Sequence, residues 1–131
     1  MANYKTTDFV IDIIYSLLGS ITVPKYRKTK PSKSTATEYV VINSLPINAQ
    51  TLQKCYVNVN YHVKDIDQGL GVGFVPDDVK LSAGTALILA ALEKVSAESY
   101  FIDFEGQETI RESQFNEHYS NLRFSFKNIN N

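Results

Sequence analysis

The feature that most constrains the fold is the stretch QKCYVNVNYHVKD, residues 53–65, in which apolar and polar side chains alternate. Successive side chains of a β-strand point to opposite faces, so this alternation predicts a strand with one buried face and one wet face. Cys55, Val57, Val59, Tyr61 and Val63 are expected on the buried face, and Tyr56, Asn58, Asn60, His62 and Lys64 on the other. On this interpretation Cys55 is a small core residue and His62 an exposed polar one.

The segments around this strand predict a sheet with two helices. Apolar residues at helical spacing indicate an amphipathic helix over 6–21, with Thr7 as N-cap and Gly19 as a stop, and a second helix over 76–99 that Asp77 or Asp78 can cap. Strands are expected over 38–47, 99–112 and 118–129. The expected fold class is α/β (α+β), a small, mostly antiparallel sheet of about four to five strands in the order α-(β)-β-β-α-β-β.

The length of 131 residues is typical of one domain with a single core. We therefore expect a single domain over residues 1–131. Within it, 24–37 is expected as a basic loop or short irregular edge strand, 65–76 as a glycine-rich loop, and 128–131 as a polar tail.

The second helix carries more apolar surface than one sheet can cover. Leu81, Ile88, Leu92 and Val95 form one stripe, but Ala86, Leu87, Leu89, Ala90 and Ala91 make its middle apolar nearly all round. We expect the first helix or a neighbouring subunit to cover the remainder.

The glycine-rich segment GLGVG, residues 69–73, lies between an expected strand and an expected helix, where nucleotide-binding loops are found. Its glycines are spaced by two, and three further residues separate them from the helix. This spacing matches neither the dinucleotide-binding fingerprint nor the P-loop. A phosphate site is therefore not indicated.

A calcium loop is not indicated either. Asp65 and Asp67 resemble the start of such a loop, but Leu70 and Pro76 occupy the positions where it requires glycine and glutamate. What remains is a flexible surface connection. We expect the backbone of residues 67–75 to be among the least ordered parts of an isolated subunit.

The sequence contains no recognisable catalytic constellation, so we expect no enzyme, no cofactor and no metal. Cys55 and His62 are seven residues apart on one strand, which places them on opposite faces. His118 beside Tyr119 can have a polar partner, but no serine or cysteine has an activating context. An enzyme would need both histidines and the carboxylates of residues 98–117 to converge on one pocket.

The single cysteine excludes an internal disulfide and favours a reducing compartment. No targeting signal and no apolar stretch long enough to span a bilayer is visible. These features predict a chain that is made and folded in the cytoplasm and does not contact membrane.

The net charge of −1 conceals a division of charge between two segments. Residues 25–33 hold five of the thirteen basic side chains, whereas residues 98–117 hold six acids and one base, Arg111. Two solvated surfaces account for this pattern, and so does a contact between the basic loop of one copy and the acidic surface of the next. A third interpretation assigns the basic loop to nucleic acid, with Tyr26 as a stacking residue.

The order of these segments resembles that of the tail-terminator, or tail-completion, proteins of long-tailed bacteriophages. The resemblance covers nearly the whole chain: an amphipathic N-terminal helix, the basic segment VPKYRKTKP, the strands EYVVINSLP and CYVNVNYHVKD, an apolar helix, and a strand pair ending EHYSNLRFSF. The glycine-rich loop has no counterpart in it.

This resemblance implies a non-enzymatic structural protein that assembles as a ring, typically a hexamer, which ends the tail tube and joins it to the head connector. The partners would be other copies, the tail-tube protein and the connector protein, with nucleic acid only as DNA passing through the ring. The protein would be located at the head–tail junction of a virion that is assembled in the bacterial cytoplasm. It would be encoded by a phage or a prophage. Candidate subunit or tail contacts are Lys25, Tyr26, Arg27, Lys28, Lys30, Lys33, Asp65, Asp67, Glu105, Glu108 and Glu112.

One alternative from a different class stays open. The basic loop 25–33 and the wet strand face of residues 56–64 can form a small nucleic-acid or ligand-binding module. Such a module would bind single-stranded nucleic acid with a steep dependence on salt.

Overall fold

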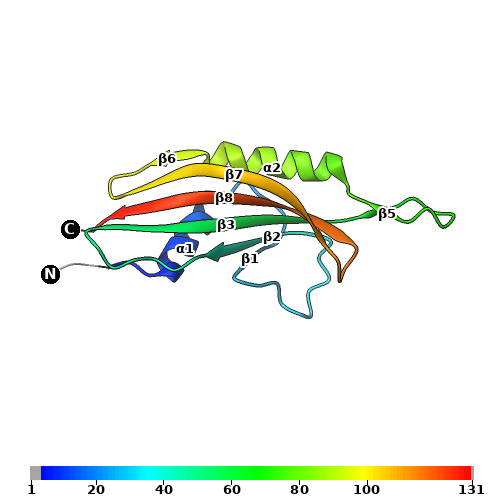
Figure 1. Cartoon of the computed structure of the whole chain (residues 1–131), viewed down its shortest axis with the longest axis horizontal. Coiled ribbons are helices and arrows are strands. Elements are labelled where there is room, and N and C mark those ends of the chain that lie inside the picture. Colours follow the sequence, from blue (N-terminus) through cyan, green and yellow to red (C-terminus); the bar gives the residue numbers. More distant parts are fainter. Residues whose placement is uncertain (1–3, 131) are drawn as a thin grey trace.

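A six-stranded sheet with both helices packed against one of its faces forms the body of the molecule (Figure 1). The computed structural model describes residues 4–130. Its helices are α1 (Thr7–Leu17) and α2 (Asp78–Leu92). Its strands are β1 (Lys25–Arg27), β2 (Glu38–Ser44), β3 (Leu52–Lys64), β4 (Ile66–Asp67), β5 (Phe74–Val75), β6 (Lys94–Ser96), β7 (Tyr100–Glu112) and β8 (Glu117–Ile129). The expected α+β class is confirmed.

The main sheet has the strand order β1-β2-β3-β8-β7-β6. Strand β1 runs parallel to β2, and every other neighbouring pair is antiparallel. Its centre consists of β3, β8 and β7, each 13 residues long. A register shift between Phe104 and Gly106 interrupts the pairing of β7 with β8. β4 and β5 pair with each other in a separate hairpin.

The core lies between the helices and the face of the sheet that β3 was expected to bury. Cys55, Val57, Val59, Tyr61 and Val63 are all buried there. β8 adds Leu122, Phe124 and Phe126 to the same core, and the two helices add Val10, Ile14, Leu81, Ile88 and Leu92. Burying these side chains is the main favourable contribution to folding.

Side chains and backbone groups fix where the helices begin and end. The N-cap of α1 is Thr6 rather than the expected Thr7, and its hydroxyl accepts from the amide of Phe9. α1 ends at Leu17, two residues before the glycine expected to stop it. Asp77 caps α2 by accepting from the amide of Lys80 at 3.1 Å, as one of the two expected alternatives.

The expected number of strands was wrong, because three short strands lay inside segments read as helix or loop. Residues 94–96 were assigned to the second helix, but the chain leaves α2 after Leu92 and forms β6, which places Val95 in a strand. The carbonyl of Glu93 accepts from the amide of Phe104, which ties this exit to β7. The glycine-rich loop contains β4 and β5.

The expected polar tail at 128–131 was also wrong. β8 continues to Ile129, which pairs with Leu52. The side chain of Asn128 is buried, and its amide donates to the Gln53 side-chain oxygen at 3.4 Å. Pairing with the first residues of β3 therefore holds this end in the sheet. Residue 131 lies outside the described residues.

The basic segment 24–37 begins with an edge strand, β1, and continues as a loop, which agrees with one of the two expectations for it. Among the described residues, neither helix is long and apolar enough to cross a membrane.

Candidate functional site

The face of the sheet opposite the helices presents a row of three aromatic side chains. Tyr39 on β2, His62 on β3 and Tyr119 on β8 are cross-strand partners. Their rings stack with centroid separations of 4.5 Å for Tyr39 and His62 and 4.6 Å for His62 and Tyr119. The row exists because the register of three strands places these residues side by side on one face.

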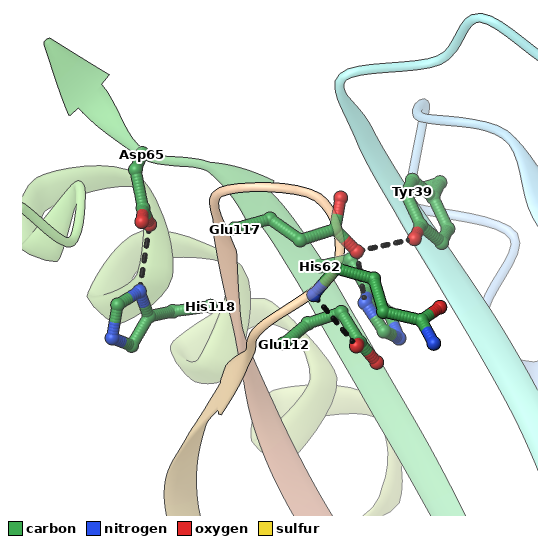
Figure 2. Close-up of polar contacts among 7 residues, drawn as sticks. Tyr39, His62, Asp65, Glu112, Glu117 and His118 are labelled. Atoms are coloured by element: carbon green, nitrogen blue, oxygen red, sulfur yellow. Dashed lines mark hydrogen bonds and ion pairs between the residues drawn. The ribbon is translucent and has the colours of Figure 1, made fainter. Parts of the chain in front are cut away.

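A buried carboxylate joins this row at the start of β8 (Figure 2). The hydroxyl of Tyr39 donates to Oε1 of Glu117 at 2.6 Å, and Nδ1 of His62 lies 2.9 Å from the same oxygen. Burial lowers the pKa of His62, an effect that Glu117 opposes. Burial and the bond to Glu117 both raise the pKa of Tyr39.

His62 was expected to be exposed, and that expectation was wrong. Only 9% of its surface is accessible, because Tyr39 and Tyr119 cover its two ring faces and Glu117 meets its edge. The alternation of residues 53–65 predicted correctly on which face of the sheet His62 lies. It could not predict which side chains of the neighbouring strands cover His62 on that face.

The second histidine forms a separate pair on the other face of the sheet. Nδ1 of His118 lies 2.6 Å from Oδ1 of Asp65, and Figure 2 shows this pair pointing away from the Tyr39, Glu117 and His62 group. Residues 117 and 118 are neighbours in β8, so their side chains point to opposite faces. The polar partner expected for His118 is confirmed. The convergence of both histidines that a catalytic site would need does not form.

A hollow of about 740 Å³, here called the face hollow, lies over the aromatic row. The loop after β1 and the turn between β7 and β8 form its walls, and its lining includes Lys28, Lys30, Tyr39, Asn60, His62 and Glu112. The Lys30 ammonium lies 4.7 Å from the ring centre of Tyr39 and 5.4 Å from that of Phe115. The structure thus brings part of the basic loop and part of the wet strand face to one place.

Acids on α1 accompany the basic residues of β1. Arg27 lies 2.9 Å from Asp12, and Lys28 lies 2.8 Å from Asp8, both in exposed pairs. The Arg27 guanidinium also lies 4.1 Å from the ring centre of Tyr15. The sequence contains no acid between residues 13 and 37, but the fold supplies two from the first helix.

The remaining basic and aromatic candidates of this segment differ in their surroundings. The Lys25 ammonium donates to the carbonyl of Ile21 at 2.7 Å. The Tyr26 hydroxyl forms a hydrogen bond with the hydroxyl of Ser34. Lys33 is exposed like Arg27 and Lys28, whereas Lys30 lines the face hollow.

The acidic candidates are divided among four places. Glu105 and Glu108 are exposed on β7, and Glu112 lines the face hollow. Asp67 is exposed in the hairpin, whereas Asp65 is buried against His118 and does not present its carboxylate on the surface. Asp65 is thus the candidate contact that the structure places inside the subunit.

The outer face of α2 is apolar and exposed. The expected inner stripe is confirmed for Leu81, Ile88 and Leu92, which are buried. On the outer face an exposed group remains, here called the α2 stripe, and it consists of Val79, Ala83, Ala86, Leu87 and Ala90. Contact with α1 does not cover it, and Leu87 stays 50% exposed.

The glycine-rich segment forms an arm, residues 66–75, that projects beyond the end of the main sheet (Figure 1). The Gln68 amide donates to the Gly73 carbonyl, and the Val72 amide donates to the Gly69 carbonyl, which closes the turn. Gly69, Gly71 and Gly73 all have positive φ, which explains why glycine is needed. The strands Ile66–Asp67 and Phe74–Val75 of this hairpin have only two residues each, so no alternation in the sequence predicted them.

Among the described residues, no group of three or more histidine, cysteine, aspartate or glutamate side chains is placed to hold a metal ion. The face hollow, the α2 stripe and the arm are three surface features on which a functional interpretation can rest. No protein-family model and no curated protein matches this chain.

Proposed function

We propose that this chain is a non-enzymatic structural protein of a phage tail. Copies assemble into a ring, a hexamer by the resemblance, that ends the tail tube and joins it to the head connector. The ring lies at the head–tail junction of the virion, and assembly takes place in the bacterial cytoplasm.

The α2 stripe is the observation that carries this proposal. Its five members share one side of a surface helix and leave an apolar strip facing water. Contiguous exposed apolar surface of this kind marks places where proteins associate. In a ring, a neighbouring subunit or the tail tube would cover this apolar strip. In a monomer, the strip would remain exposed to water.

The experiment replaces Leu87 in the middle of the stripe with glutamate. The matched control is Leu45→Glu, which places the same charge at a leucine that is 39% exposed and lies outside the stripe. Mass in solution is measured by sedimentation, alone and in the presence of a phage tail-tube protein. We expect the wild type and Leu45→Glu to form rings or bind tubes, and Leu87→Glu to lose at least tenfold in affinity.

Two outcomes contradict the proposal. A wild-type chain that stays monomeric at high concentration and ignores tail tubes removes the ring function. If Leu87→Glu assembles as well as the wild type, the α2 stripe is not part of the ring contact. Circular dichroism of both variants controls for folding.

The face hollow favours a second candidate function, a small nucleic-acid or ligand-binding module. It joins Lys28 and Lys30 of the basic loop to Asn60 and Tyr119 of the strand faces. Binding through these lysines to a phosphate backbone would weaken steeply as salt rises. The binding module therefore predicts salt-dependent binding of nucleic acid, which the ring function does not require.

This candidate is tested with labelled single-stranded DNA and fluorescence anisotropy over a range of salt concentrations. The double variant Lys28→Ser/Lys30→Ser is compared with Lys94→Ser, an exposed lysine outside both the face hollow and the strand face of residues 56–64. The module requires that the double variant lose affinity and salt dependence while the control keeps both. Binding that is absent in the wild type, or unchanged in the double variant, ends this interpretation.

A further inference from the structure

A second, smaller hollow of about 390 Å³ lies at the end of the sheet opposite the arm, and we call it the end hollow. It is formed where β3 begins, β8 ends and β6 makes the edge of the sheet. Leu52 and Ile129, both partly exposed at 49% and 38%, line it together with Val95 and Phe101. Lys94 and Lys127 also line it, with Asp103 as the acid among them.

The arm carries the complementary chemistry at the other end of the molecule. Leu70 at its tip is fully exposed, and Val72 is 72% exposed. Leu70 also has a positive φ, a backbone conformation that is costly for a leucine and that here directs its side chain into water. Asp67 is the exposed acid of the arm, where its carboxylate accepts from the Gly69 amide at 2.8 Å, and residues 66–75 contain no base.

We propose that the arm of one copy inserts into the end hollow of the next copy. Leu70 and Val72 would pack against the apolar lining, and Asp67 would face the ammonium groups of Lys94 and Lys127. This contact deepens the proposed ring function, on which it rests, because it names surfaces that join neighbouring subunits.

One chain cannot satisfy this contact by itself. The arm and the end hollow are separated by strands of 13 residues, roughly 40 Å at about 3.3 Å per residue. The two surfaces also differ, so the contact is head-to-tail, and it closes into a ring when the rotation between copies allows.

The first experiment places cysteines at both ends of the proposed contact. The double variant Leu70→Cys/Ile129→Cys is oxidised in air with a copper–phenanthroline catalyst and examined without reductant. Cys55 is buried and does not compete. We expect a ladder of covalent oligomers, and at most dimers from Leu70→Cys alone. The matched control Leu45→Cys/Ile129→Cys moves one cysteine to an exposed leucine outside the arm.

The second experiment exchanges the charges. Asp67→Lys is expected to weaken self-association at least tenfold in light scattering, and adding Lys94→Asp and Lys127→Asp is expected to restore it. Leu70→Ser should weaken association without changing the fold, because Leu70 is fully exposed within the subunit.

The outcomes separate this contact from the ring function. If Leu87→Glu loses assembly while Leu70→Ser keeps it, and the cysteine variant forms no more ladder than its control, the arm contact is overturned and the ring stands. If the wild type stays monomeric with tail tubes present and the cysteine variant forms no ladder, both are overturned. A ladder together with charge rescue establishes the contact.

Discussion

At Gly84 the backbone of α2 lies directly against the ring of Tyr61 on β3. A Cβ at this position would sit 2.3 to 2.6 Å from three atoms of that ring, well inside van der Waals contact. The ring has little freedom to move, because it is buried and its hydroxyl donates to the carboxylate of Glu38. The close approach of helix and sheet therefore requires glycine here.

The variant Gly84→Ala is expected to be less stable despite the better helix propensity of alanine. Overpacking a core costs about 1–3 kcal/mol, and alanine returns about 1 kcal/mol in a helix, so we expect a net loss of up to about 2 kcal/mol. Urea unfolding measures it, with the exposed Ser82→Ala as control. An unchanged unfolding midpoint would show that Tyr61 can move aside.

His62 makes the stability of the fold depend on pH. Its pKa in the folded chain is lowered, chiefly by burial, below the ordinary value of 6.5 that the unfolded chain retains. As pH falls through 6.5, the unfolded chain takes up a proton first, so stability decreases until the folded pKa is passed. Above that window the contribution of His62 is fully present. Glu117 and Lys30 act on the same ring in opposite directions.

We therefore expect the free energy of unfolding to fall between pH 7.5 and 5.5, by at most about 1.4 kcal/mol per pH unit from this group. Urea unfolding at several pH values measures it. His62→Gln should flatten the dependence and lower stability at pH 7.5, because Glu117 loses one partner. Identical pH slopes in both proteins would exclude His62 as the cause.

The environment of a single residue could be predicted from the sequence where its own strand determines it. It could not be predicted where residues of several strands together determine it. Cys55 and its neighbours in β3 follow their own strand's alternation, and all lie in the core as expected. His62 lies on the expected face, but Tyr39 and Tyr119 come from segments 23 and 57 residues away in the chain, and their register is a tertiary property. Glu117 was likewise read as one of six acids, not as the partner of a histidine.

Among the elements, the arm differs most from the rest of the fold. Within the described residues, β4 and β5 pair with each other and with no strand of the main sheet. Two strands of two residues each bury little and hold few backbone hydrogen bonds. An element of this kind opens at almost no cost in free energy, whereas the central strands open near the cost of global unfolding.

Hydrogen exchange tests this contrast. In a monomeric sample the amides of residues 67–75 are expected to exchange fastest among the elements, while those of β3 and β8 are expected to exchange slowest. Protection of the arm should rise when copies associate. Slow exchange in the monomer would mean that the arm is rigid without a partner, against the expectation of a flexible connection.

Long elements with a clear period could be predicted, and short ones could not. The helical spacing of α1 and the alternation of β3 and β8 each extend over ten residues or more, so the pattern decided the type. β6 has three residues and follows α2 after a single residue, and its strand character comes from pairing with β7. β1 likewise takes its parallel partner from the tertiary fold.

At the scale of the whole molecule, charge is less divided than the sequence suggested. Asp8 and Asp12 of α1 approach Lys28 and Arg27, so part of the basic segment is matched within the subunit. Each of these exposed ion pairs contributes about 0–1 kcal/mol to the free energy of unfolding. Most of the stability therefore comes from the buried core. The ion pairs instead weaken the proposal that the basic segment joins subunits, and they favour the α2 stripe and the arm as the proposed contacts.

Assembly and stability are linked in this molecule if copies associate through these surfaces. Association stabilises the folded chain by mass action, and a hundredfold rise in concentration above the dissociation constant is worth about 2.7 kcal/mol. For a chain of this length that corresponds to a rise in Tm of roughly 10 °C. This rise in Tm can be measured by circular dichroism, with thermal unfolding followed at protein concentrations that span this hundredfold range.

The same melts distinguish the two candidate functions. Leu87→Glu and Leu70→Ser are expected to melt at a Tm that does not depend on concentration, near the wild-type value at high dilution. A monomeric binding module would instead show a constant Tm for the wild type as well, and a rise only when its ligand is added. Together with the binding to tail tubes, the wild-type concentration series tests whether the exposed apolar surfaces of α2 and the arm bind other copies of the chain.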